Sequence, residues 1–187
     1  MIFLNYLING ISLGSIYAII ALGYTMVYGI AKMLNFAHGD VIMAGAYICF
    51  FSMSGLSGQF EEGSLAAAVV PAVAGTLAAM VVCTVLGIVI ERLAYKPLRQ
   101  AGSLAVLITA IGVSYFLQNA AQLLWSSSQK MFTPVISRDL QLSLPGGLSI
   151  SVLTILTVCV CVVIMVALML FTGRTKMGKA MRAVSED

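Results

Sequence analysis

The chain has 187 residues, of which 60% are hydrophobic and only 9% are charged, and its mean hydropathy is +1.03. Soluble domains carry roughly 25% charged residues, so this composition excludes a water-exposed globular domain and indicates an integral membrane protein. The net charge of +3 does not indicate nucleic-acid binding, because such proteins gather basic residues on a folded soluble face that this chain cannot form.

Five apolar runs predict an all-α polytopic membrane protein, because a spanning helix needs about 20 mostly apolar residues. No positive charge precedes the first run, which is too long for a cleaved signal peptide, so we expect it to be retained. The second run is short. The expected spans are residues 4–30, 41–57, 65–90, 104–125 and 148–171.

Basic residues alternate between the two sides of these spans. The first and third breaks and the tail hold one, three and four Lys or Arg residues, whereas the second and fourth breaks hold none and two. The positive-inside rule therefore predicts an N-terminus outside and a C-terminal tail in the cytoplasm. Losing one crossing would mix the two sets, so the bias favours five.

Small residues recur at helical spacing in two of the spans. Gly10, Gly14 and Ala18 are four residues apart in the first span, and Gly75 and Ala79 are four apart in the third. Residues of this size let helices approach closely in lipid. We therefore expect a compact bundle.

Four cysteines lie inside the apolar runs, and their spacing is not that of a zinc site: Cys49, Cys83, Cys159 and Cys161. We expect them to act as small packing residues, with no metal and no cofactor bound.

The fourth span carries a polar face. Ser114, Gln118 and Gln122 are four residues apart, and Asn119 lies beside them. Two interpretations stay open, namely hydrogen bonds to a partner helix and the lining of a water-filled path. The outer segment that follows, residues 126–147, is either a plain connector or a cover for the outer mouth that could contact an external partner.

The break between the first two spans reads Leu-Asn-Phe-Ala-His-Gly-Asp over residues 34–40 and holds the only histidine. If the stretch is helical, Asn35 and His38 share a face. Asp40 could cap a helix that starts at Val41. The break, near residues 32–40, is therefore either a cytoplasmic turn with a helix cap or a discontinuity where polar groups line a transport path.

The tail, residues 173–187, has the pattern of an amphipathic helix. Met177, Ala180, Met181 and Val184 fit one apolar stripe, with Lys176, Lys179 and Arg182 on the other face. Such a helix either lies on anionic lipid headgroups or docks into a groove of a cytosolic protein.

Three motifs resemble one permease family. They are Leu-Asn-Phe-Ala-His-Gly-Asp at 34–40 followed by Ala-Gly-Ala-Tyr at 44–47, Glu-Arg-Leu-Ala-Tyr-Lys-Pro-Leu-Arg at 91–99, and Gly-Lys-Ala-Met-Arg-Ala-Val-Ser-Glu-Asp at 178–187. Together they resemble the inner-membrane permease of bacterial branched-chain amino-acid ATP-binding-cassette (ABC) importers, in the subunit with the Asn-Phe-Ala-His-Gly motif. Members run to roughly 290 residues, so the resemblance implies that this chain is the N-terminal part of one permease domain.

The resemblance implies a transport subunit without catalytic residues, working with a second homologous permease, two cytosolic ATPase subunits and a periplasmic amino-acid-binding protein. It implies a multi-pass protein of the bacterial inner membrane that translocates leucine, isoleucine or valine. Alternatives are an ABC permease of the same family for urea or for another amino acid or amide, and a stand-alone secondary transporter. A membrane enzyme is disfavoured, because one histidine and scattered serines supply no catalytic constellation.

Two sets of residues are candidates for function. The candidate substrate pathway consists of Asn35, Phe36, His38, Gly39, Asp40, Gln118 and Asn119. The candidate ATPase-coupling segment consists of Lys176, Met177, Gly178, Ala180, Met181, Arg182 and Val184.

Overall fold

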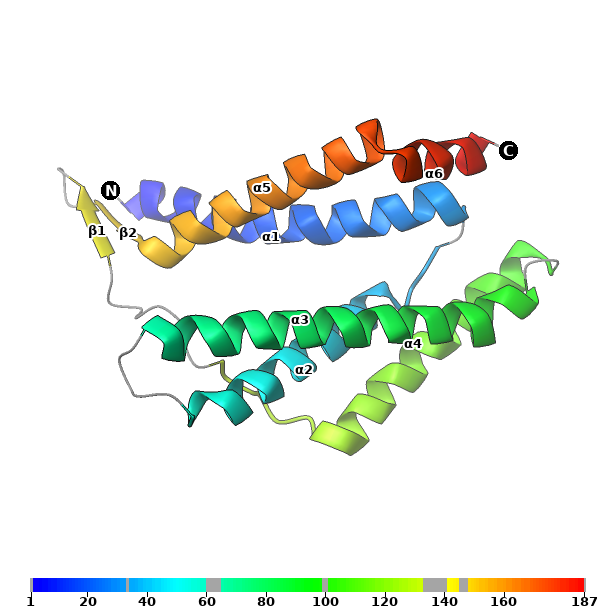
Figure 1. The fold of residues 1–187 in the computed structure, drawn as a ribbon, viewed down its shortest axis with the longest axis horizontal. Helices are drawn as coiled ribbons and strands as arrows, with labels where there is room; N and C mark the ends of the chain where they lie inside the picture. The colour runs from blue at the N-terminus through cyan, green and yellow to red at the C-terminus, as the bar shows by residue number, and fades with distance from the viewer. Residues whose placement is uncertain are drawn as a thin grey trace. The chain divides into compact units, whose positions relative to one another are not determined.

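The computed structural model of the protein describes residues 2–32, 34–59, 65–98, 101–132, 141–144 and 148–186. Five helices in this described part are long and apolar enough to cross a membrane, which confirms the all-α polytopic fold class. Most of their large apolar side chains are exposed, as expected for helices whose solvent is lipid. The contacts divide the chain into two compact units, residues 1–32 with 136–187 and residues 33–135 (Figure 1).

The first unit pairs the N-terminal helix with the C-terminal helices. Helix α1 (Ile2–Ala31) runs beside α5 (Val152–Arg174) in the same direction, and the short helix α6 (Lys176–Glu186) contacts both (Figure 1). Helix α1 ends where Lys32 adopts a left-handed φ of 53° and its N–H donates to the Tyr28 carbonyl at 2.9 Å.

A small antiparallel hairpin precedes α5. Strand β1 (Gln141–Leu144) pairs with β2 (Leu148–Ser151), with Gln141 opposite Ser151 and Leu144 opposite Leu148. The fifth helix therefore begins at Val152 and not at residue 148, because residues 148–151 are strand. The outer segment, residues 126–147, was expected to be a connector or a cover for the outer mouth. Its last described residues, Gln141–Leu144, form strand β1 of this hairpin.

The second unit consists of three helices. Helix α2 (His38–Ser57) packs along α3 (Leu65–Ile90), and α4 (Ser103–Trp125) contacts α2 and the end of α3. Figure 1 shows α3 antiparallel to both α2 and α4. Helix α4 ends at Trp125. The next residue, Ser126, has a φ of 64°, and its N–H donates to the Gln122 carbonyl at 2.9 Å.

Glycines and cysteines make the contact between α2 and α3 close. A Cβ added at Gly45 would lie 2.7 Å from the Cys83 sulfur, and one at Gly75 would lie 3.0 Å from the Cys49 carbonyl oxygen. The Cys83 thiol also contacts the Val41 carbonyl at 3.4 Å. The packing role predicted for the cysteines is thus observed for Cys83 and Cys49. In contrast, Gly10 and Gly14 of α1 have no described atom within 4 Å of an added Cβ, so these two do not mediate the contact with α5.

The end of α3 changes helical type before the chain turns. Residues Glu91–Tyr95 form one π-helical stretch (η1) and Lys96–Leu98 a 3₁₀ turn (η2). The core of the unit lies here, where Ile90, Tyr95 and Ala110 are buried with Val41 packed against them. The start of α2 is therefore held between the end of α3 and the first half of α4.

The observed helices agree closely with the predicted spans except at the start of α5 and at the break. Helix α2 starts at His38, three residues before the expected Val41, so the described residues 32 and 34–37 form the discontinuity. Asn35 lies outside the helix, so the condition under which it would share a helical face with His38 is not met. Pro71 lies inside α3, six residues after its start. Whether the chain forms a single permease domain stays a prediction.

Candidate functional site

Asn35 organises the turn that precedes α2. Its side-chain oxygen accepts a hydrogen bond from the Ala37 N–H at 3.1 Å, and its carbonyl accepts from the His38 N–H at 3.2 Å. The same side-chain oxygen accepts from the Tyr95 hydroxyl at 2.8 Å. Because asparagine side chains stabilise turns by bonding the backbone two residues on, Asn35 fixes the break locally. Tyr95 in addition ties the break to the end of α3.

Asp40 is the buried ionisable residue of this site, with only 7% of its surface exposed. Its carboxylate accepts a hydrogen bond from the Ser114 hydroxyl and one from the Gln118 amide, the latter at 3.0 Å. The Gln118 amide also donates to the Ser114 hydroxyl oxygen at 3.1 Å. Two neutral donors on one face of α4 therefore hold an acidic group of α2.

The hypothesis that Asp40 caps the helix is wrong. The N-cap position is Ala37, which makes no side-chain capping bond, and Asp40 lies inside the first turn of α2. The carboxylate instead accepts hydrogen bonds from Ser114 and Gln118 of α4. The negative charge in this turn still suits the positive end of the helix dipole.

The contacts also locate Asp40 along α4. Ser114 and Gln118 are 11 and 15 residues after Ser103, the first residue of the helix (114 − 103 and 118 − 103). At about 1.5 Å per residue, the carboxylate lies roughly 17–23 Å along α4. The start of α2 is therefore level with the middle of a helix long enough to cross the membrane, which favours the broken-helix interpretation over an ordinary turn beyond the helix ends.

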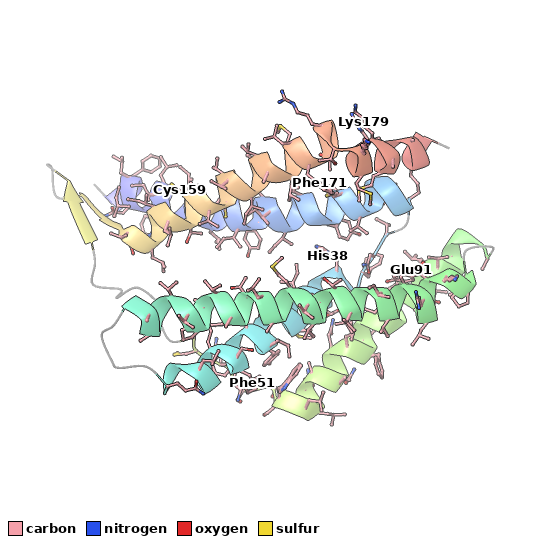
Figure 2. All side chains as sticks on the ribbon, viewed as in Figure 1. His38, Phe51, Glu91, Cys159, Phe171 and Lys179 are labelled. Carbon is pink, nitrogen blue, oxygen red and sulfur yellow. The ribbon has the colours of Figure 1, made fainter. Side chains whose placement is uncertain are left out.

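The remaining candidates for the substrate pathway are Phe36, His38, Gly39 and Asn119. His38 is half-buried at the start of α2, where Figure 2 labels it, and Phe36 is 46% exposed. An added Cβ at Gly39 would meet no described atom within 4 Å. The Asn119 amide bonds its own helix, donating to the Tyr115 carbonyl at 2.7 Å. Sequence reasoning thus grouped Asn119 with Gln118, but the structure joins only Gln118 to Asp40.

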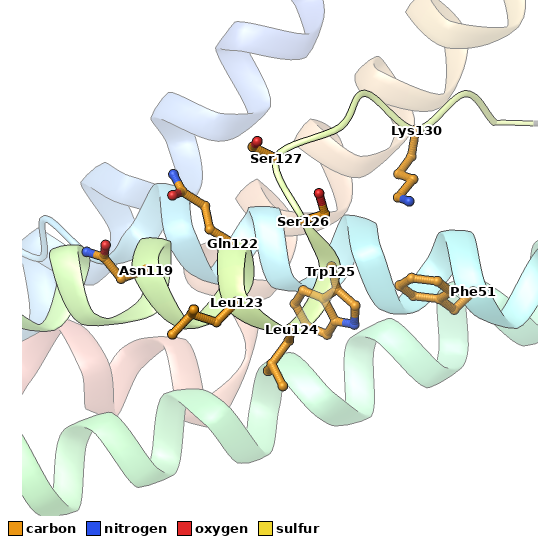
Figure 3. Close-up of a pocket in the computed structure, with 9 residues that line it drawn as sticks. All are labelled: Phe51, Asn119, Gln122, Leu123, Leu124, Trp125, Ser126, Ser127 and Lys130. Atoms are coloured by element: carbon orange, nitrogen blue, oxygen red, sulfur yellow. The ribbon is translucent and has the colours of Figure 1, made fainter.

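Asn119 instead lines a pocket at the carboxyl end of α4 (Figure 3). The pocket has a volume of about 680 Å³ and its lining includes Phe51, Gln122, Trp125 and Lys130. Among the described residues, no group of three potential metal ligands was found.

The tail forms the expected helix, and α5 fixes its position. The Thr175 hydroxyl donates to the Phe171 carbonyl at 2.6 Å and accepts from the Gly178 N–H at 3.0 Å. Threonine at this position caps the start of α6. The Arg182 guanidinium donates to the Gly173 carbonyl at 3.0 Å, at the end of α5 where a cation is favoured.

The face of α6 that meets α5 is set by Gly178. This residue is buried, and a Cβ added there would lie 2.4 Å from the Thr172 carbonyl oxygen and 2.5 Å from that of Phe171. Met177 is 62% exposed, and Lys179 is exposed as well. Among the other coupling candidates, the side chains of Lys176, Ala180 and Arg182 are exposed and that of Met181 is half-buried. The Val184 side chain lies outside the described residues.

Comparison with known proteins identifies the family. Residues 6–187 match the family described as "Branched-chain amino acid transport system / permease component". The chain belongs to this permease family.

Named relatives of this permease chain include proteins from three bacteria. It is 41% identical over 187 residues to the high-affinity branched-chain amino acid transport system permease protein BraD of Pseudomonas aeruginosa, covering 99% of the chain and 60% of BraD. It is 40% identical to LivH of Escherichia coli and 38% identical to LivH of Salmonella typhimurium, with 99% of the chain and 59% of each relative covered. The chain therefore spans about three fifths of the length of these relatives. No solved structure matches it.

Two residues that make contacts in the candidate site were missing from the predicted set. Ser114 is a donor to Asp40, and its signal was the four-residue spacing from Gln118 on the polar face of the fourth span. Tyr95 is the donor to Asn35, and it lies in the Glu-Arg-Leu-Ala-Tyr-Lys-Pro motif. Both contacts join residues 60 or more positions apart, so the sequence could mark the residues but not pair them.

Proposed function

We propose that this multi-pass membrane protein is a permease subunit of an ABC importer that carries branched-chain amino acids across the bacterial inner membrane. The observation that carries the proposal is the family match across residues 6–187, in a chain with five helices able to cross a bilayer. The names of BraD and LivH indicate the substrate class. Energy would come from ATP hydrolysis on separate cytosolic subunits, since the permease component itself is a transport subunit.

The substrate path would pass the discontinuity before α2, formed by Asn35, Phe36, His38, Gly39 and Asp40. Support comes from the buried Asp40 carboxylate, its bond to Gln118 and its level halfway along α4. Ionisable groups at membrane depth are costly and are generally retained for function. Asn119 would line the same path at the other end of α4.

The coupling segment would be α6, the helix that an ATPase subunit grips. Support comes from its capping by Thr175 and from the exposed Met177 and Lys179, which leave an apolar and a basic contact for a partner. Because Gly178 packs against backbone atoms of α5, a force on α6 would be transmitted to that helix. Lys176, Ala180, Met181, Arg182 and Val184 would complete this surface.

The other partners are a second homologous permease subunit and a periplasmic binding protein that delivers the amino acid. The N-terminus would face the periplasm and α6 the cytoplasm, as the distribution of Lys and Arg predicts. An Ala180→Cys variant in intact cells should resist a membrane-impermeant maleimide, whereas Ser127→Cys should react. Reaction at residue 180 from outside would overturn the orientation and the assignment of α6 to the ATPase.

The transport assignment is tested by uptake. The importer is reconstituted with its ATPases, its second permease and its binding protein, and radiolabelled leucine uptake into proteoliposomes is measured. We expect uptake that requires ATP, that valine and isoleucine inhibit, and that urea does not. Uptake of urea without leucine would refute the amino-acid assignment, and leucine uptake without ATPase subunits would favour a stand-alone transporter.

The coupling assignment is tested by adding one methyl group at Gly178. Gly178→Ala should lower ATP-driven uptake roughly tenfold, because overpacking against α5 backbone costs about 1–3 kcal/mol and displaces α6. Gly173→Ala is the matched control, because an added Cβ there meets no described atom within 4 Å. Equal uptake by the two variants would contradict the role of α6.

A further inference from the structure

The pocket at the carboxyl end of α4 is separate from the Asp40 site. Its lining comes from one residue of α2, five of α4 and three of the segment that follows: Phe51, Asn119, Gln122, Leu123, Leu124, Trp125, Ser126, Ser127 and Lys130. Its volume of about 680 Å³ falls in the range of small-molecule sites, roughly 300–1,000 Å³. Figure 3 shows Trp125 between Phe51 and Lys130 on one side and Gln122 and Asn119 on the other.

Aromatic contacts fix one wall of this pocket. The Trp125 ring stacks on Tyr47 with centroids 4.7 Å apart and lies 6.1 Å from Phe51. Tyr47 and Phe51 are themselves stacked at 6.4 Å on α2. Because rings of two helices hold one another, the exposed part of the wall offers a pre-formed apolar face with little rotamer entropy to lose on binding.

The polar groups of the pocket have complementary chemistry. Lys130 brings an ammonium group, and among the described lining residues there is no carboxylate. The Asn119 amide nitrogen is bonded to the Tyr115 carbonyl, so its side-chain oxygen is left as an acceptor beside the Gln122 amide. A carboxylate ligand suits Lys130, and an ammonium ligand suits amide oxygens and aromatic faces.

We propose that this pocket binds a free zwitterionic amino acid with an apolar side chain, before the amino acid enters the membrane path. The substrate carboxylate would contact Lys130, its ammonium group would lie over the face of Trp125, and its side chain would lie on Phe51. The inference rests on the proposed function for the substrate class, and it adds an entry site that is distinct from the Asp40 cluster.

The position of the pocket agrees with an entry role. Asp40 contacts Ser114 and Gln118 while Tyr47 contacts Trp125, so α2 and α4 run in the same direction, and the end of α4 lies level with the middle of α2. The basic segment with Arg92 and Lys96 lies at the other end of α4, before its first residue. Under the proposed orientation, the pocket therefore opens on the outer side, where a binding protein releases its amino acid.

Trp125 makes the test direct, because it is the only tryptophan of the chain. The purified chain in lipid nanodiscs is titrated with L-leucine while tryptophan emission is followed, and far-UV circular dichroism confirms its helix content. We expect a saturable change with leucine. Leucinamide, which lacks the carboxylate, should need at least about a tenfold higher concentration, as loss of a charge-assisted hydrogen bond predicts.

Variants separate the pocket from unspecific partitioning. Lys130→Gln should weaken the leucine response at least about tenfold, whereas Lys96→Gln, outside the pocket, should leave it unchanged. A helical protein whose emission does not respond to leucine, or responds equally to leucine and leucinamide, overturns the inference. The measurement needs no ATPase, so an importer that takes up leucine without this response would refute the pocket and leave the transport function standing.

Discussion

The close contact of α2 with α3 gives a prediction whose size follows from the structure. Gly45→Ala places a methyl carbon 2.7 Å from the Cys83 sulfur, whereas non-bonded carbon atoms are most stable at about 3.5–4.0 Å. Either the helices separate by about 1 Å or the Cys83 thiol rotates and loses its contact with the Val41 carbonyl. Since Asp40 precedes Val41 on α2, both responses would also disturb the site.

The expected cost of Gly45→Ala is about 1–3 kcal/mol of unfolding free energy, the usual penalty for overpacking. Cys83→Ala removes the sulfur that the methyl group meets. The double variant should therefore be more stable than the sum of the single effects predicts, with a coupling energy of about 1–2 kcal/mol. Gly55→Ala on the same helix meets no described atom within 4 Å, and it should be neutral or stabilise by up to about 1 kcal/mol.

The assay is reversible unfolding of the chain by sodium dodecyl sulfate in mixed micelles, followed by Trp125 emission from the same unit. Gly45→Ala should lower the detergent concentration at which half of the chain is unfolded, whereas Gly55→Ala should leave it unchanged or raise it. If the effects of Gly45→Ala and Cys83→Ala add to within about 0.5 kcal/mol, the two side chains do not compete for space and the reasoning is refuted.

Two further predictions concern the site. Asp40→Ala removes the acceptor of the Ser114 hydroxyl and one of the two acceptors of the Gln118 amide, and it should cost about 1–3 kcal/mol in the same unfolding assay, whereas Asp40→Asn keeps one acceptor oxygen and should cost clearly less. If the two variants unfold alike, the hydrogen bonds are not what holds α2 to α4. Tyr95→Phe removes the 2.8 Å hydrogen bond to Asn35 and should cost about 0.5–1.5 kcal/mol. A Tyr95→Phe chain as stable as the parent would show that this bond does not hold the break.

The fourth span shows what the spacing of polar residues along a helix can and cannot predict. The pattern Ser114, Gln118, Gln122 predicted either interhelical hydrogen bonds or a wet path. The structure assigns the first role to Ser114 and Gln118, which bond Asp40, and places Gln122 in an open pocket. Periodicity gives the face of a helix, but it does not say which neighbour each part of the face meets.

The tail gives a similar result. Its helix was predictable from the alternation of apolar and basic residues over residues 176–184. The face that packs on α5 was not, because it is set by Gly178, which has no side chain and gives no signal in an apolar pattern. The predicted apolar stripe is partly free instead, with Met177 62% exposed.

The sequence by itself determined the number, order and approximate limits of the spans, because crossing a bilayer requires only a local run of apolar residues of sufficient length. Only the tertiary structure decided the partners of Asp40 and Asn35, which lie 74 and 60 residues away in the chain at Ser114 and Tyr95. Such pairs depend on how helices meet, and hydrophobic length carries no information about that.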